Sequence, residues 1–140
     1  MSDSVFFDTN ILVYAFASKK SDVRSVRQDA AQKIVIQGGV IGVQVLNEFV
    51  QVCRKKMLLD WAQIEWALQA IYGLCQNAAP TTMETHEMAV NFSRRYGLHI
   101  YDSLMIAAAV QCGCSTIYSE DLQHGQVIDG VRIVNPFAQI

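Results

Sequence analysis

The chain has 140 residues, of which 51% are hydrophobic, and its formal net charge at pH 7 is -2. These values predict one domain over residues 1–140 with a substantial core, and they exclude a surface that is basic throughout, so an RNA partner would need a local basic patch. The longest apolar stretch, 104–110, falls far short of the ~20 residues of a membrane span. We therefore expect a soluble, cytoplasmic protein with reduced cysteines and no membrane contact.

The first predicted strand ends abruptly on polar residues. Residues 5–7 are apolar and rich in aromatic and β-branched side chains, and they are followed by Asp8, Thr9 and Asn10. The apolar residues 11–16 are better read as a helix. Asp8 is therefore expected where a buried strand passes into a helix, and in open α/β sheets ligands bind at the carboxyl ends of strands.

The rest of the chain alternates between helical and extended patterns. Apolar periodicity predicts helices over 23–35, 44–57, 61–75, 82–96 and 101–110, and strands over 40–43, 115–118 and 131–134, with 77–81 a turn or a short extended piece and 123–125 a loop. Asp60 is expected to cap one helix and Gly97 to end another. The segment 101–110 is apolar nearly all round, which indicates a buried helix. The order of these strands and helices along the chain predicts an α/β fold with a mainly parallel central sheet flanked by helices.

Acidic residues recur just after strands or in the opening turns of helices: Asp8, Glu48, Asp102 and Asp121. No Lys or Arg adjoins any of them in sequence. If they lie at one edge of one sheet, they repel one another and raise one another's pKa values. A bound divalent cation would relieve this repulsion. Oxygen ligands alone favour Mg²⁺ or Mn²⁺. Taken singly, each residue has an ordinary alternative as a helix cap, a solvated helix residue or a turn residue.

The acidic segments resemble the motifs of the PIN domain, and most closely those of the VapC-type toxin ribonucleases of bacterial toxin–antitoxin pairs. The segments that carry the resemblance are 7–12, 45–49, 101–109 and 119–122. The resemblance runs from the first strand to the last and implies a PIN-like fold. Each motif is short, but their order, spacing and context together are specific.

The resemblance implies an endoribonuclease dependent on Mg²⁺ or Mn²⁺, with RNA as substrate, a cognate antitoxin as partner and a homodimer as assembly. By that analogy the metal-binding and catalytic residues are Asp8, Glu48, Asp102 and, at a more variable position, Asp121. Glu120 beside it leaves open which of the two carboxylates faces the site. Thr9 matches a polar position beside the first acid, and Asn10 and Ser119 are candidates to orient the ligands. Hydrolysis by a metal-activated water needs no protein nucleophile, and the implied products carry a 5′-phosphate and a 3′-hydroxyl.

Two further groups of residues are candidates for contacts outside this centre. The basic cluster that follows the first helix is the first choice for binding RNA phosphates, although such runs are commonly solvated: Lys19, Lys20, Arg24 and Arg27. The large aromatic residues of the fourth helix, Trp61, Trp66 and Tyr72, are expected in the core or at a subunit interface rather than stacked on bases. His99 is expected either to line the cleft around the acidic residues or to be packed against other residues of the protein.

Other functions fit the sequence less well. A PIN-fold module that binds RNA or protein without significant turnover remains the main alternative, and intact acids at all the positions argue against it. A phosphotransferase of the haloacid dehalogenase type needs a second Asp where Asn10 stands. A receiver domain needs a late lysine after a strand, and a dinucleotide-binding fold needs a glycine-rich turn after the first strand. The sequence supplies neither.

Overall fold

A computed structural model describes residues 4–17, 25–75 and 77–140. Within these ranges one sheet of six strands has the order β3-β2-β1-β4-β6-β5. The strands are β1 (Val5–Phe7), β2 (Val40–Gly42), β3 (Asn77–Ala79), β4 (Thr116–Tyr118), β5 (Val127–Ile128) and β6 (Val131–Val134). The helices are α1 (Thr9–Phe16), α2 (Val26–Val35), α3 (Val43–Lys55), α4 (Trp61–Leu74), α5 (Met83–Tyr96) and α6 (Ile100–Gln111).

Strand β1 lies at the centre of the sheet. It pairs in parallel with β2 on one side and with β4 on the other, where Phe7 is level with Tyr118. Phe6 and Phe7 point to opposite faces because side chains alternate along a strand, and both are fully buried. Helices therefore have to cover both faces of the sheet, as a mainly parallel sheet requires.

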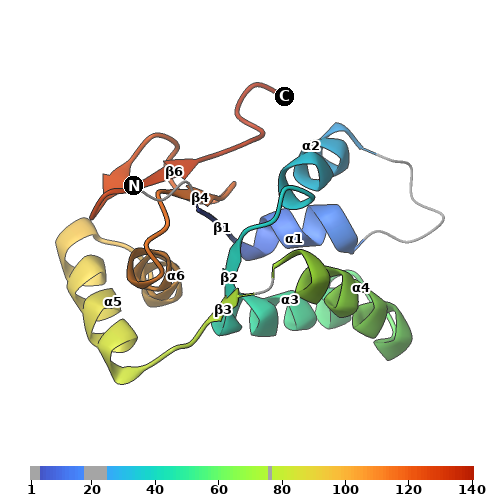
Figure 1. The fold of residues 1–140 in the computed structure, drawn as a ribbon, viewed down its shortest axis with the longest axis horizontal. Helices are drawn as coiled ribbons and strands as arrows, with labels where there is room; N and C mark the ends of the chain where they lie inside the picture. Colours follow the sequence, from blue (N-terminus) through green and yellow to red (C-terminus); the bar gives the residue numbers. More distant parts are fainter. Residues whose placement is uncertain (1–3, 18–24, 76) are drawn as a thin grey trace.

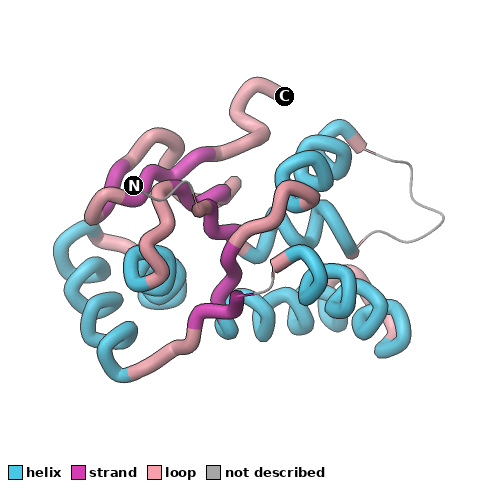
Figure 2. The backbone as a smooth tube through the Cα atoms, viewed as in Figure 1, coloured by secondary structure: helices cyan, strands magenta, loops and turns pink. Residues whose placement is uncertain are grey.

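Figures 1 and 2 show how the helices are divided between the two faces. Helices α5 and α6 pack together on one face, whereas α1, α2, α3 and α4 lie on the other. Residues 105–109 of α6 are all buried, and the helix contacts β2, β4 and β6. The predicted α/β fold with a mainly parallel sheet and the predicted buried helix are both confirmed.

Two strands were not predicted as such. For 77–81 the sequence predicts a turn or a short extended piece, and its first residues form β3, which adds a parallel edge strand beside β2. Strand β5 was missed altogether, and it pairs antiparallel with β6. Asp129 and Gly130 join these two strands with φ of 47° and 81°, which is the geometry that an Asp-Gly pair favours in a two-residue hairpin.

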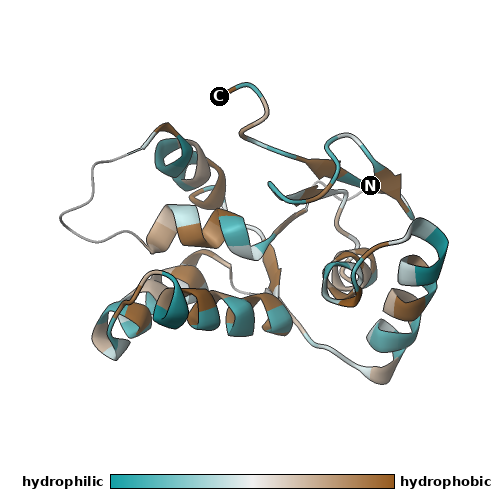
Figure 3. Cartoon of the chain, turned by 180° about the vertical axis from the view of Figure 1, so that it is seen from behind, coloured by the Kyte–Doolittle hydropathy of each residue, from teal (hydrophilic) through white to brown (hydrophobic). Residues whose placement is uncertain are grey.

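The predicted helix ends that fall within the described ranges agree with the structure to within about two residues, and the predicted start at residue 23 lies outside those ranges. Asp60 caps α4 with a full capping box, and Gly97 ends α5 in the left-handed conformation with φ of 69°. Helix α3 begins at Val43, so that residue opens the helix and does not belong to β2 as predicted. Hydrophilic and hydrophobic residues alternate along α3 and α5 in Figure 3, as expected for helices with one face on the core. Within the described ranges, the helices are all too short or too polar to cross a membrane.

Candidate active site

The site is built at the carboxyl edge of the parallel strands. Asp8 directly follows β1, and its backbone N–H donates to the carbonyl of Tyr118 at 3.0 Å. Ser119 directly follows β4, and its N–H donates to the carbonyl of Val134 at 3.0 Å. These bonds extend the ladder by one residue, so both polar side chains leave the sheet at the same edge. Asp8 is only 7% exposed and Ser119 is fully buried.

The buried carboxylate of Asp8 is fixed by three donors. The backbone N–H of Thr9 donates to Oδ1 at 2.6 Å, which makes Asp8 the N-cap of α1. The hydroxyl of Ser119 donates to Oδ2 at 2.7 Å, and the amide of Asn10 donates to the same oxygen at 3.2 Å. Asp8 is thus a helix cap as well as a candidate ligand. The donors that set its orientation come from α1 and from the residue directly after β4.

Asn10 joins Asp8 to Asp121. Its Nδ2 donates to Asp121 Oδ2 at 3.0 Å as well as to Asp8, and its Oδ1 accepts the backbone N–H of Glu120 at 3.2 Å. One amide side chain therefore bridges the end of β1 and the segment after β4. The backbone N–H of Asp121 also donates to the Ser119 hydroxyl at 3.2 Å.

Glu48 reaches the same place from α3. The hydroxyl of Thr9 donates to Glu48 Oε2 at 3.0 Å, and Gln44, one turn earlier on α3, donates to Oε1 at 3.3 Å. Thr9, which directly follows Asp8, thus connects Glu48 on α3 to the end of β1. The predicted position of Glu48 at the rim of the core is confirmed by its partial burial.

Asp102 approaches from the first turn of α6. It is half-buried, and burial raises the pKa of its carboxyl, with smaller contributions from Asp121 and Glu48, while His99 acts in the opposite direction. His99 caps α6, accepting the backbone N–H of Tyr101 at 3.3 Å. The side chain of His99 is exposed, so the packed alternative for it is wrong.

The electrostatics link the acidic residues into one group. Burial raises the pKa of Asp8 to about 6. The hydrogen bonds from Ser119 and Thr9 lower it, and the charges of Asp121 and Asp102 raise it further. Glu48 in turn influences Asp102. The four predicted acids therefore gather at one edge of the sheet, where the charges of their neighbours disfavour the ionised forms of Asp8 and Asp102.

Asp121, not Glu120, is directed toward Asp8. The Glu120 carboxylate accepts the Tyr14 hydroxyl and lies 3.4 Å from Nε of Arg27, whereas Asp121 accepts the Asn10 amide. Arg27 thus lies beside the site on α2, although its guanidinium already has a carboxylate partner. The other predicted RNA-binding residues lie outside the described ranges: Lys19, Lys20 and Arg24.

The contact between Tyr14 and Glu120 was not predicted. Tyr14 lies four residues after Asn10 on α1, and residues at that spacing share one side of a helix. Since Asn10 was already a candidate, the spacing was a usable signal. Its partner could not be found in the same way, because Glu120 is 106 residues away in the chain.

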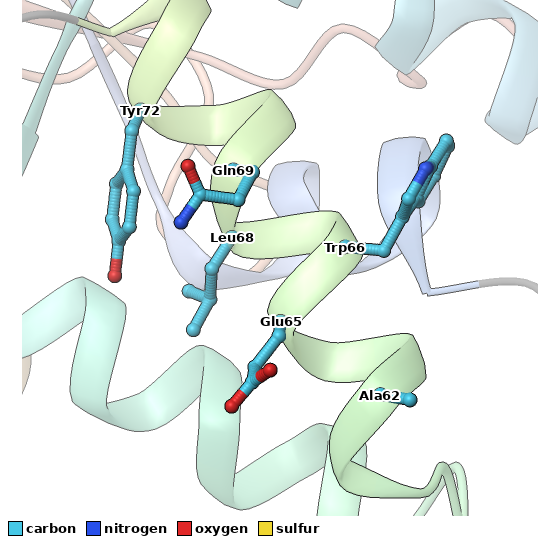
Figure 4. A pocket seen from close by; sticks show the side chains of 6 residues that line it. All are labelled: Ala62, Glu65, Trp66, Leu68, Gln69 and Tyr72. Carbon is cyan, nitrogen blue, oxygen red and sulfur yellow. The ribbon is translucent and has the colours of Figure 1, made fainter.

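The aromatic residues of α4 do not belong to the core. Trp61, Trp66 and Tyr72 are 56%, 72% and 45% exposed, so the core alternative for them is wrong. Figure 4 shows Trp66 and Tyr72 beside a surface hollow that is also lined by Ala62, Glu65, Leu68 and Gln69. The predicted subunit interface remains a prediction. This hollow lies on α4 and does not include the acidic residues.

The donor set suits a hard divalent cation that keeps part of its water shell. Among the described residues, no three His, Cys, Asp or Glu side chains are arranged to hold an ion together. Mg²⁺ prefers oxygen ligands, retains several waters and is commonly held by one or two carboxylates. Asp8 offers two oxygens oriented by hydrogen bonds, and Asp121, Glu48 and Asp102 add further carboxylates at the same edge of the sheet, which an ion could reach through its bound waters. The residues therefore fit a hydrated Mg²⁺ or Mn²⁺ ion.

Comparison with known proteins places the chain in a family. The PIN domain matches residues 5–128. The comparison with curated proteins finds no relative. Among solved structures, a toxin-antitoxin complex from Klebsiella pneumoniae has a TM-score of 0.70 at 20% identity, covering 95% of this chain and 98% of the other. The sarcin-ricin loop-cleaving toxin VapC20 of Mycobacterium tuberculosis has a TM-score of 0.64 at 16% identity, covering 84% of this chain and 90% of that toxin.

The chain belongs to the PIN-domain family, since the match spans most of its length. The matched range contains all four acidic residues at the edge of the sheet, and it ends at the last residue of β5. The similarity to the two solved structures extends the agreement to the fold as a whole. The predicted PIN-like fold is thus confirmed.

Proposed function

We propose that this chain is a metal-dependent endoribonuclease and the toxin component of a toxin–antitoxin pair. The observation that carries the proposal is the buried carboxylate of Asp8, which is held by three hydrogen bonds at the carboxyl edge of the sheet. It faces other carboxylates, and none of the described residues places a cation beside it. Membership of the PIN-domain family and the similarity to a toxin that cleaves RNA support it.

In this proposal Asp8, Glu48, Asp102 and Asp121 hold Mg²⁺ or Mn²⁺, directly or through water. A bound ion of this kind lowers the pKa of its water and stabilises the charge on the leaving oxygen of a phosphodiester. The contacts of Thr9, Asn10 and Ser119 with these carboxylates keep their oxygens in place. Such partners of ligands commonly matter nearly as much as the ligands themselves.

The proposed partners are an RNA substrate and a cognate antitoxin, with a second copy of the chain as a further partner. The likeness of the fold to a toxin-antitoxin complex supports the antitoxin. The exposed aromatic residues Trp61, Trp66 and Tyr72 of α4 support a protein interface of some kind. A single nuclease domain over residues 1–140 and a cytoplasmic location remain predictions.

The test is cleavage of a mixed RNA pool by purified protein free of its partner, with Mg²⁺, Mn²⁺ or EDTA. The variant Asp8→Asn removes one charge at the centre, and Asp129→Asn removes one charge in the exposed β5–β6 turn as a matched control. We expect cleavage by the unaltered chain and by the control, and none by Asp8→Asn or in EDTA. Cleavage that persists in EDTA or in Asp8→Asn would contradict the proposal. An inert chain that binds RNA but not Mn²⁺ would favour the binding module.

A further inference from the structure

Three successive side chains after β4 point to three different partners. Ser119 donates to Asp8, and Asp121 accepts from Asn10. Between them, Glu120 is turned toward α1 and α2. The chain therefore carries two adjacent carboxylates, and only that of Asp121 faces the proposed metal centre. The contacts of Glu120 explain why it does not.

Glu120 is held by two partners. The hydroxyl of Tyr14 donates to its two carboxylate oxygens at 2.9 and 3.2 Å, and Nε of Arg27 lies 3.4 Å from Oε1. Burial, followed by the hydrogen bond to Glu120, raises the pKa of Tyr14, so its phenol keeps the proton that it donates. Arg27 supplies the positive charge that balances the carboxylate.

The two partners are themselves packed against one buried ring. Phe137, in the turn after β6, contacts the ring of Tyr14 edge to face at a centroid separation of 5.0 Å. The guanidinium carbon of Arg27 lies 6.0 Å from the centroid of the same ring. Glu120 is thus anchored to α1, α2 and the C-terminal turn at once, and α1 and α2 lie side by side in Figure 1.

We propose that Glu120 is a positioning residue, which Tyr14 and Arg27 hold away from the proposed metal centre so that Asp121 faces it. This inference rests on the proposed function, because it concerns the same centre. Anchoring Glu120 has two consequences. It fixes the segment between Ser119 and Asp121, and it keeps a fifth carboxylate out of a group whose members already repel one another.

The inference is tested by Mn²⁺ titration of the whole chain, followed by calorimetry, in a double-mutant cycle. Tyr14→Phe removes the hydroxyl that holds Glu120 but keeps the ring that packs on Phe137. Asp121→Asn removes the carboxylate through which Glu120 is proposed to act. Tyr96→Phe is the matched control, since it removes a tyrosine hydroxyl from the last residue of α5, a helix that packs on α6.

We expect Tyr14→Phe to weaken Mn²⁺ binding about 10-fold, the lower end of the effect of removing a partner of a ligand. The same change in the Asp121→Asn background is expected to have no further effect, and Tyr96→Phe is expected to bind Mn²⁺ like the unaltered chain. Unfolding by urea shows whether each variant is folded. If Tyr14→Phe does not fold, Arg27→Gln replaces it, because Arg27 is the more exposed partner.

Two results would overturn the inference while leaving the metal centre intact. One is Mn²⁺ affinity that Tyr14→Phe leaves unchanged. The other is that Tyr14→Phe weakens Mn²⁺ binding equally in the unaltered chain and in the Asp121→Asn background, since its effect would then not pass through Asp121. Failure of the unaltered chain to bind Mn²⁺ would instead contradict the proposed function, and the inference with it.

Discussion

The ionised form of Asp8 is expected to destabilise the metal-free protein. Burial raises the pKa of Asp8 from 3.8 to about 6. Between these values the folded chain keeps a proton that the unfolded chain has released, so this residue's contribution to stability is present at low pH and lost as the pH rises through the window. At about 1.4 kcal/mol for each pKa unit, the loss amounts to roughly 3 kcal/mol once Asp8 is ionised.

Urea denaturation in EDTA, from about pH 4 to about pH 7, measures this contribution when the unaltered chain is compared with Asp8→Asn. The difference between their free energies of unfolding removes the titrations that both chains share. As the pH rises, the unaltered chain is expected to lose roughly 3 kcal/mol of stability relative to the variant. Saturating Mg²⁺ is expected to restore stability to the unaltered chain alone, by about 2.7 kcal/mol at 100 times Kd. A difference in free energy of unfolding that does not change with pH, or that changes in favour of the unaltered chain, would refute the reasoning.

Two other predictions concern the hydrogen bonds of the site and the packing beneath it. Ser119→Ala removes a donor that lowers the pKa of Asp8, so the acid limb of the cleavage pH profile is expected to move to higher pH, and an unchanged limb would contradict this role. Gly39→Ala places a Cβ 2.5 Å from the buried ring of Phe7 and is expected to lower the free energy of unfolding by about 1–3 kcal/mol. Gly73→Ala meets no atom within 4 Å, so urea denaturation is expected to show no loss for it; equal losses would mean that the contact with Phe7 is not the cause.

The sequence was sufficient for the fold class and for the edge of the sheet on which the acids lie. Asp8 could be placed because a buried strand ends directly before it, and Asp102 because it opens an apolar helix. Both signals are local. Strand β3 has no such signal, since it is a three-residue edge strand whose pairing with β2 is set by the tertiary fold. Strand β5 does have a local signal, because the Asp129-Gly130 pair is typical of a two-residue hairpin turn.

Contacts between distant residues could not be derived in this way. The bridge from Asn10 to Asp121 spans 111 residues, and the orientation of Glu120 depends on Tyr14 and Arg27, which come from two other helices. Neighbouring acids such as Glu120 and Asp121 have the same residue chemistry, and only packing distinguishes them. The exposure of Trp66 could not be derived from the sequence either, because a large aromatic residue in an amphipathic helix is more often buried than exposed.

The chemistry of the cut ends tests the central claim most directly. Hydrolysis by a metal-activated water at the Asp8 centre is expected to leave a 5′-phosphate and a 3′-hydroxyl on the cleaved RNA. End-specific labelling of the products made with Mg²⁺, before and after phosphatase treatment, determines which groups are present. Products with a 2′,3′-cyclic phosphate and a 5′-hydroxyl would show attack by the RNA's own 2′-hydroxyl, and they would contradict hydrolysis by a metal-activated water.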